Sequence, residues 1–152
     1  MPSSPAGIAV NNKGVIAVAD LDGHCIQVFD ETEKFVRKLG SPGHMDGQFD
    51  EPVDVTFFND DEILVADECN HRIQQLNVQT GNFVKSFGKQ GSGDGEFKIP
   101  TSVCISSDGC FMTTAEFRFL QWMVNLCLSL KTAAQKGWII CSFSSVAWTN
   151  AL

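Results

Sequence analysis

The sequence repeats itself at an interval of 47 to 48 residues, and this repeat limits the possible folds more than any other feature. The segment GSPGHMDGQF at residues 40–49 returns as GKQGSGDGEF at residues 88–97. The prolines Pro5, Pro52 and Pro100 keep the same spacing. A constant interval across several motifs indicates that one structural unit was duplicated, and the shared order of apolar runs and turns within the units agrees with this.

Each unit contains four short apolar runs that are separated by clusters of Asn, Asp, Gly and Lys. Runs of Val, Ile, Phe and Ala with such boundaries are typical of a four-stranded antiparallel meander. The second run is apolar on consecutive residues, which requires burial of both faces, whereas the fourth is half polar and suits an outer edge. In the first unit, the predicted strands are residues 7–10, 15–19, 25–29 and 35–39.

Sheets that are buried on both faces and that recur at about 45 residues stack radially as the blades of a β-propeller. We therefore predict an all-β fold, an incomplete β-propeller whose four-stranded blades span residues 5–50 and 51–98, with part of a third at 99–112. A solenoid of strands is the weaker alternative, because its repeats are usually shorter. Propellers typically close with about four to eight blades, so we expect a fragment or a chain that needs a partner to cover its apolar blade faces.

The composition changes abruptly after Met112. Residues 1–112 carry 8 Lys and Arg against 17 Asp and Glu, whereas residues 113–152 carry 3 against 1 and contain all three tryptophans. We therefore predict a repeat region up to Met112 and an unrelated tail, which a truncated or alternatively spliced reading frame would explain. A capping-box pattern and apolar residues at helical spacing predict a helix over 115–134, which would cover an exposed blade face. The apolar run at 138–143 predicts a strand.

The first residues and the charge of the chain narrow the choice of compartment and partner. The start, MPSSP, has neither the basic nor the apolar segment of a secretory signal, and the longest apolar stretch is shorter than the about 20 residues that span a bilayer. We therefore expect a cytoplasmic protein with its six cysteines as thiols and with no membrane partner. The acidic repeat region disfavours nonspecific binding of nucleic acid, because it repels phosphate groups.

The motifs PxGIAV, VAD, NHRIQ and GxGDGxF closely resemble those of the NHL repeat family, over residues 5–111. The second unit carries the cluster Asn70-His71-Arg72, whereas the first has Gly23 in place of the asparagine. Among NHL proteins, these repeats look most like the C-terminal propeller of TRIM-NHL ubiquitin ligases, in which a RING, B-boxes and a coiled coil precede the propeller. The resemblance implies a propeller that selects protein or RNA partners in a ubiquitination pathway. Because the sequence has no zinc-finger array of Cys and His, no ligase chemistry is expected in this chain.

Two aspartates, Asp20 and Asp67, end the second apolar run of their units and precede a loop with a histidine. A carboxylate beside an imidazole could polarise a base or orient a metal ligand. The pair recurs in each unit, however, whereas an active site is singular, so we interpret both aspartates as structural turn residues that accept loop amide hydrogen bonds. The other residues expected to turn the chain between blades are Gly40, Gly88, Asp46 and Asp94.

The blade loops supply the predicted binding residues, which are Asn70, His71, Arg72, His24 and Lys89. Arg72 and Lys89 could join a basic patch that binds RNA, and the alternative for them is a solvated strand edge. We predict no catalytic residue, metal, cofactor or small-molecule substrate. Some NHL propellers are zinc lyases, but this chain has only three histidines and no tyrosine, which disfavours that activity. The predicted function is a non-catalytic module that binds a protein partner. The alternatives to protein binding are RNA binding and a structural fragment without activity.

Overall fold

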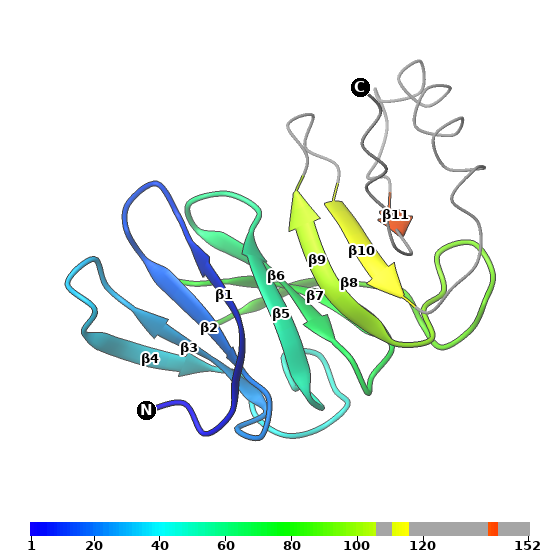
Figure 1. The fold of residues 1–152 in the computed structure, drawn as a ribbon, viewed down its shortest axis with the longest axis horizontal. Coiled ribbons are helices and arrows are strands. Elements are labelled where there is room, and N and C mark those ends of the chain that lie inside the picture. The colour runs from blue at the N-terminus through cyan, green and yellow to red at the C-terminus, as the bar shows by residue number, and fades with distance from the viewer. Residues whose placement is uncertain (106–110, 116–139, 143–152) are drawn as a thin grey trace, which may run out of the picture.

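The computed structural model describes residues 1–105, 111–115 and 140–142, and these residues form an all-β fold (Figure 1). Two antiparallel sheets have four strands each, and a third sheet has three. The strands are β1 (Pro5–Val10), β2 (Ile16–Asp20), β3 (Cys25–Phe29), β4 (Phe35–Leu39), β5 (Pro52–Phe57), β6 (Glu62–Asp67), β7 (Arg72–Asn77), β8 (Phe83–Phe87), β9 (Pro100–Ile105), β10 (Phe111–Ala115) and β11 (Ile140–Ser142). The predicted fold class, an incomplete propeller of four-stranded blades, is confirmed.

The first two sheets, β1–β4 (blade 1) and β5–β8 (blade 2), keep their strands in chain order, and β9 and β10 open a third blade. β2 and β6 are buried on consecutive residues and β4 and β8 form outer edges, as the apolar pattern predicts. The first strands of the three blades lie beside one another, with β5 between β1 and β9 (Figure 1). β1 and β5 approach closely at Gly7, where a Cβ atom would lie 2.6 Å from the Cα of Asp54.

Blades 1 and 2 pack face to face through a single apolar cluster. Side chains directly opposite each other on antiparallel strands share a face, so each blade has two faces. The back face of blade 1 carries Ala17, Ala19, Ile26, Val28 and Leu39, and the front face of blade 2 carries Val55, Ile63, Val65 and Leu76. Phe49, from the loop between the blades, completes this cluster and is 0% exposed.

Blade 2 packs on blade 3 in the same manner. Its back face carries Leu64, Ala66, Ile73 and Phe87, which pack with Val103 of β9. Phe97 joins this second cluster just as Phe49 joins the first. The duplicated sequence therefore produces a duplicated contact between blades, and each contact is completed by one phenylalanine from the loop that precedes the next blade.

The loop between blades 1 and 2 begins with a glycine that contacts this phenylalanine. Gly40 has a φ of 83°, and a Cβ atom there would lie 2.4 Å from the ring of Phe49. Gly88 repeats the arrangement with a φ of 87° and a distance of 2.3 Å to Phe97. An L-residue at either position would have both a strained backbone and a steric clash.

Gly40→Ala should therefore lower the free energy of unfolding by about 2–6 kcal/mol, because a left-handed conformation and overpacking each cost about 1–3 kcal/mol. The matched control is Gly95→Ala, whose φ is 72° but whose added Cβ would have no atom within 4 Å. Gly95→Ala should lower the free energy of unfolding by only about 1–2 kcal/mol. Urea unfolding followed by circular dichroism measures both, and equal losses would show that the Phe49 contact does not matter.

Blade 3 departs from the other two in its second strand. β10 runs to Ala115, three residues past the boundary predicted at residue 112. In blades 1 and 2 the second strand ends in an aspartate opposite the first proline, but β10 has Ala115 in this place. Thr113 occupies the place of Val65, and its buried hydroxyl has no hydrogen-bond partner in the described part of the chain. The third unit therefore lacks the carboxylate of the first two.

Much of the predicted tail lies outside the described residues. These include the helix predicted over 115–134, apart from Ala115, which belongs to β10. β11 lies within the run at 138–143 and pairs with β10 in parallel. In blades 1 and 2 the third strand is antiparallel to the second, so the pairing in blade 3 differs from that in the first two blades.

Candidate functional site

The blades present two ends to solvent (Figure 1). The loop end holds the β2–β3 and β6–β7 loops and the loops between blades, residues 40–51 and 88–99. The turn end holds the β1–β2, β3–β4, β5–β6 and β7–β8 turns. The residues predicted from the sequence to bind a partner all fall at the loop end, so its geometry decides which of them a partner can reach.

Asp67 organises the loop end of blade 2. Its side chain is buried where β6 ends, and its Oδ1 accepts a hydrogen bond from the Asp50 amide at 2.8 Å. Its Oδ2 accepts from Arg72 Nε at 2.8 Å, from Asn70 Nδ2 at 2.9 Å and from Gln74 Nε2 at 3.0 Å. An ionised carboxylate has about four acceptor sites. Four donors therefore converge on the Asp67 carboxylate, which acts as a structural hub.

Two of these donors also hold the loop between blades. Arg72 Nη2 donates to the carbonyls of Met45 and Gln48, both at 2.9 Å. Gln74 donates to the Gln48 carbonyl at 2.6 Å and accepts from the Gly47 amide at 2.9 Å. The Arg72 side chain is only 11% exposed. It lies neither on a solvated strand edge nor in an open basic patch, because its guanidinium is directed into the protein.

Asp20 has the same place in blade 1 but different donors. Its carboxylate accepts hydrogen bonds from the amides of Ser3 and Ser4, from the Ser3 hydroxyl and from Gln27 Nε2, at 2.8 to 3.1 Å. Burial raises the pKa of this carboxyl group, but the hydrogen bonds from Ser4, Ser3 and Gln27 together outweigh burial and hold the pKa well below its ordinary value. The charged form of Asp20 therefore fixes the segment before β1 to the end of β2.

This lowered pKa predicts acid sensitivity. The folded pKa lies below the unfolded value of about 3.9, so the stabilisation is complete above about pH 5 and is lost as the pH falls through the folded pKa. Asp20→Asn should flatten the decrease in unfolding free energy between about pH 5 and pH 2. Urea unfolding across this range measures the slope. A slope for Asp20→Asn equal to that of the wild type would contradict the assignment.

His24 and His71 each connect a blade to the start of the next. His24 Nδ1 accepts a hydrogen bond from the Glu51 amide at 3.2 Å and lies 3.5 Å from Asp50 Oδ1. His71 Nδ1 bonds the carbonyl of Lys98, so this nitrogen must be the donor. The two histidines hold equivalent positions in the repeat. When neutral, His24 needs its proton on Nε2 and His71 needs it on Nδ1. Both histidines therefore link one blade to the next.

The remaining predicted residues of the loop end differ in exposure. Asn70 Nδ2 donates to the Gly43 carbonyl at 2.9 Å, and Asn70 Oδ1 lies 2.6 Å from His44 Nδ1. Lys89 Nζ pairs with Glu96 Oε1 at 3.1 Å, with the lysine side chain 77% exposed. Asp46 and Asp94 are exposed in the two loops between blades. The predicted residues thus come together, but most of their polar atoms are bonded within the protein.

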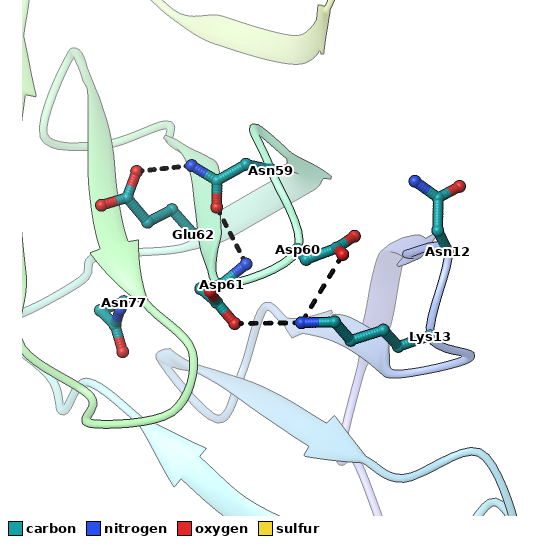
Figure 2. Close-up of a pocket in the computed structure, with 7 residues that line it drawn as sticks. All are labelled: Asn12, Lys13, Asn59, Asp60, Asp61, Glu62 and Asn77. Carbon is teal, nitrogen blue, oxygen red and sulfur yellow. Dashed lines mark hydrogen bonds and ion pairs between the residues drawn. The ribbon is translucent and has the colours of Figure 1, made fainter.

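The opposite, turn end carries a pocket of about 610 Å³ (Figure 2). It lies between successive blades and is lined by Asn12, Lys13, Asn59, Asp60, Asp61, Glu62 and Asn77. Three carboxylates against one ammonium make its walls negative. In the sequence, most of these residues belong to the polar clusters that separate the apolar runs. The acidic run at residues 60–62 is the sequence signal that could have predicted this pocket. In the first repeat, the equivalent positions hold Lys13 and its neighbours.

Lys13 spans the two turns that form this pocket. Its Nζ lies 3.6 Å from Asp60 Oδ2 and 3.5 Å from Asp61 Oδ1 (Figure 2). The Lys13 side chain is 56% exposed, and ion pairs with such exposure are worth only about 0–1 kcal/mol. Asn11 Nδ2 holds the turns together by donating to the Asp60 carbonyl at 2.9 Å. A cationic group of a partner can therefore compete with Lys13 without disturbing the fold.

Neither a metal cluster nor a membrane-spanning helix is found in the described residues. Across residues 1–105, 111–115 and 140–142, no three His, Cys, Asp or Glu side chains gather as metal ligands would. None of these residues forms a helix with the length and apolar character that a bilayer span requires.

Comparison with known structures supports the propeller fold. The chain superposes on virginiamycin B lyase from Staphylococcus aureus with a TM-score of 0.57 and 16% identity, over 76% of this chain and 36% of that one. It superposes on Kuenenia stuttgartiensis hydrazine synthase with a TM-score of 0.53 and 18% identity, over 69% of this chain and 28% of that one. At these identities the likeness concerns the fold alone.

Sequence comparison identifies the repeats themselves. Protein brain tumor of Drosophila melanogaster is 39% identical over 77 residues, which are 49% of this chain and 7% of that relative. The NHL repeat profile matches at two places, each covering the first three strands of a blade. Residues 3–29 and 49–76 therefore resemble NHL repeats.

Proposed function

We propose that this chain is a non-catalytic recognition module that binds a protein partner at the turn end of its blades. The observation that carries the proposal is the open, negative pocket between blades 1 and 2, in a chain whose repeats resemble those of the NHL family. The similarity to protein brain tumor supports an interaction role. We further propose that the chain is part of a TRIM-NHL-like protein that acts in a cytoplasmic ubiquitination pathway. The lyases with a similar fold share too little sequence to support a catalytic role.

The charge of the pocket favours a partner with basic side chains. Asp60 and Asp61 are 38% and 57% exposed, so both carboxylates are accessible to a Lys or Arg from another molecule. RNA is disfavoured at the two candidate surfaces, because three of the basic side chains there are paired with carboxylates. These pairs are Lys13 with Asp60 and Asp61, Arg72 with Asp67, and Lys89 with Glu96.

The test measures binding of the full chain to a fluorescent peptide of alternating Lys and Gly, to its Glu counterpart and to single-stranded RNA. The Lys peptide should bind, and Asp60→Asn with Asp61→Asn should weaken it about fivefold, as expected for two exposed charges. The matched control, Asp46→Asn with Asp94→Asn, removes two exposed carboxylates at the loop end. Tighter binding of RNA, or equal weakening by both double variants, would contradict the proposal.

A further inference from the structure

Lys13 reaches into the turn-end pocket but is held only loosely by its two aspartates. Its Nζ lies 3.6 Å from Asp60 Oδ2 and 3.5 Å from Asp61 Oδ1, whereas a hydrogen bond from a cationic nitrogen to a carboxylate is about 2.7–2.9 Å long. The pair of Arg72 with Asp67 at the loop end shows the contrast, because its nitrogen and oxygen lie 2.8 Å apart and both side chains are buried or nearly so. The Lys13 ammonium therefore neutralises the pocket in part without being fixed in it.

The turn that carries the two aspartates is held by bonds that do not involve the lysine. The Asp61 amide donates to Asn59 Oδ1 at 2.9 Å, and the Asp61 carbonyl accepts from the Val78 amide at 2.8 Å. The Asp60 carbonyl accepts from Asn11 Nδ2 at 2.9 Å. These bonds hold the backbone of both aspartates, so their carboxylates should stay at the pocket when the lysine leaves it.

The third carboxylate of the pocket is engaged within the protein. Glu62 Oε2 accepts hydrogen bonds from Asn59 Nδ2 and from Gln75 Nε2, both at 2.9 Å (Figure 2). The side chains of Asp60 and Asp61, by contrast, are 38% and 57% exposed and meet the lysine only at ion-pair distance. The two aspartates are therefore the carboxylates that a cation from another molecule can reach, while Glu62 adds negative charge to the wall.

The position of the two aspartates suits a guanidinium better than an ammonium. The Lys13 ammonium is a compact point charge that lies at nearly equal distances from one oxygen of Asp60 and one of Asp61 (Figure 2). A guanidinium carries five donors in a planar fork, on three different nitrogens, so it can donate to both carboxylates at once. The pocket volume of about 610 Å³ is within the range of about 300–1,000 Å³ that is usual for ligand pockets, so an arginine side chain has room to enter.

We propose that Lys13 is an internal competitor, which occupies the place of an arginine side chain of the protein partner and leaves when the partner binds. This inference rests on the proposed function, because it concerns the same pocket. In the free chain the lysine lowers the affinity for any cation that enters. It thereby favours a partner whose guanidinium replaces both of its ion pairs with hydrogen bonds. Removing the Lys13 charge should tighten binding and leave the fold unchanged.

Fluorescence anisotropy on the full chain tests the proposal with labelled peptides of alternating Arg and Gly and of alternating Lys and Gly. The wild type should bind the Arg peptide at least twofold more tightly than the Lys peptide. Lys13→Met should tighten binding of the Arg peptide about two- to fivefold, the range expected from the loss of one competing exposed ion pair. Lys13→Gln should act in the same way, and circular dichroism should show the wild-type fold for both variants.

Two control variants separate competition at the pocket from a general change of charge. Lys13→Arg keeps the positive charge at the pocket, so it should not tighten binding. Lys98→Met removes an exposed lysine from the loop end, at the opposite end of the blades. It lowers the net charge by the same amount as Lys13→Met and should keep the wild-type affinity.

The possible outcomes distinguish this inference from the proposed function. If Asp60→Asn with Asp61→Asn weakens binding of the Arg peptide but Lys13→Met leaves it unchanged, the pocket binds a partner and the competing role of Lys13 is wrong. Equal tightening by Lys13→Met and Lys98→Met, or tightening by Lys13→Arg, would also overturn the inference. A wild type that prefers the Lys peptide would overturn the choice of arginine. If neither peptide binds the wild type or Lys13→Met, both the inference and the proposed function are wrong.

Discussion

Phe49→Ala is expected to lower the free energy of unfolding by about 3–5 kcal/mol, the usual cost of removing a fully buried aromatic ring. The ring is 0% exposed, lies in the cluster between blades 1 and 2, and contacts Gly40. Such a loss is a large part of the about 5–15 kcal/mol that stabilises an ordinary domain. Urea unfolding followed by circular dichroism gives the value.

The control for this variant lies in the same loop. Met45 is 73% exposed, so Met45→Ala should change the free energy of unfolding by no more than about 0.5 kcal/mol. Phe97→Ala should resemble Phe49→Ala, because Phe97 is 1% exposed in the equivalent place. A loss below about 1 kcal/mol for Phe49→Ala would mean that the loop does not contribute to the contact between blades.

Asp67→Ala should have a comparable effect, also about 3–5 kcal/mol, because it removes one partner of a buried ion pair. The Arg72 guanidinium would lose its carboxylate while only 11% exposed, and the amides of Asn70 and Gln74 would lose an acceptor. The same urea unfolding measurement applies. Asp46→Ala, an exposed aspartate of the loop end, should be nearly neutral.

A double-mutant cycle separates this ion pair from general damage to the loop. Arg72→Met removes the cation, so Asp67→Ala in that background should cost about 1–3 kcal/mol less than in the wild type. Strictly additive losses would contradict a direct interaction between Asp67 and Arg72.

The strands and their order could be predicted from the sequence because local signals mark them. Turn residues limit the runs at 25–29 and 35–39, and β3 and β4 have these bounds. β1 begins two residues before the predicted start, at Pro5, because proline is tolerated at the first position of a strand. The repeat interval likewise predicts that two blades have the same construction.

The arrangement of the loop end could not be predicted, because its bonds join residues far apart in the chain. The sequence alone suggests that Arg72 is a cation on the surface. In the structure, its guanidinium donates to the carbonyls of Met45 and Gln48, which lie 27 and 24 residues earlier in the chain. His24 and His71 look like loop ligands, whereas each bonds the backbone 27 residues later. These contacts form only when one blade packs on the next.

The turn-end pocket was missed for the same reason. Lys13 and the carboxylates of Asp60 and Asp61 come from turns of different blades, and stacking alone brings them to 3.6 and 3.5 Å. Seen separately, each turn is an ordinary polar hairpin connection. The pattern of one unit therefore predicts a blade but not the surface between two blades.

The stacking of blades is tested most directly by nuclear Overhauser effects between the first strands of blades 1 and 2. Gly7 approaches the backbone of Asp54 so closely that a Cβ atom would lie 2.6 Å from the Asp54 Cα. The full chain should give a strong cross-peak between the Hα atoms of Gly7 and Asp54, beside those between the paired strands β1 and β2. Cross-peaks within blade 1 and within blade 2 but none between Gly7 and Asp54 would contradict the stacked arrangement.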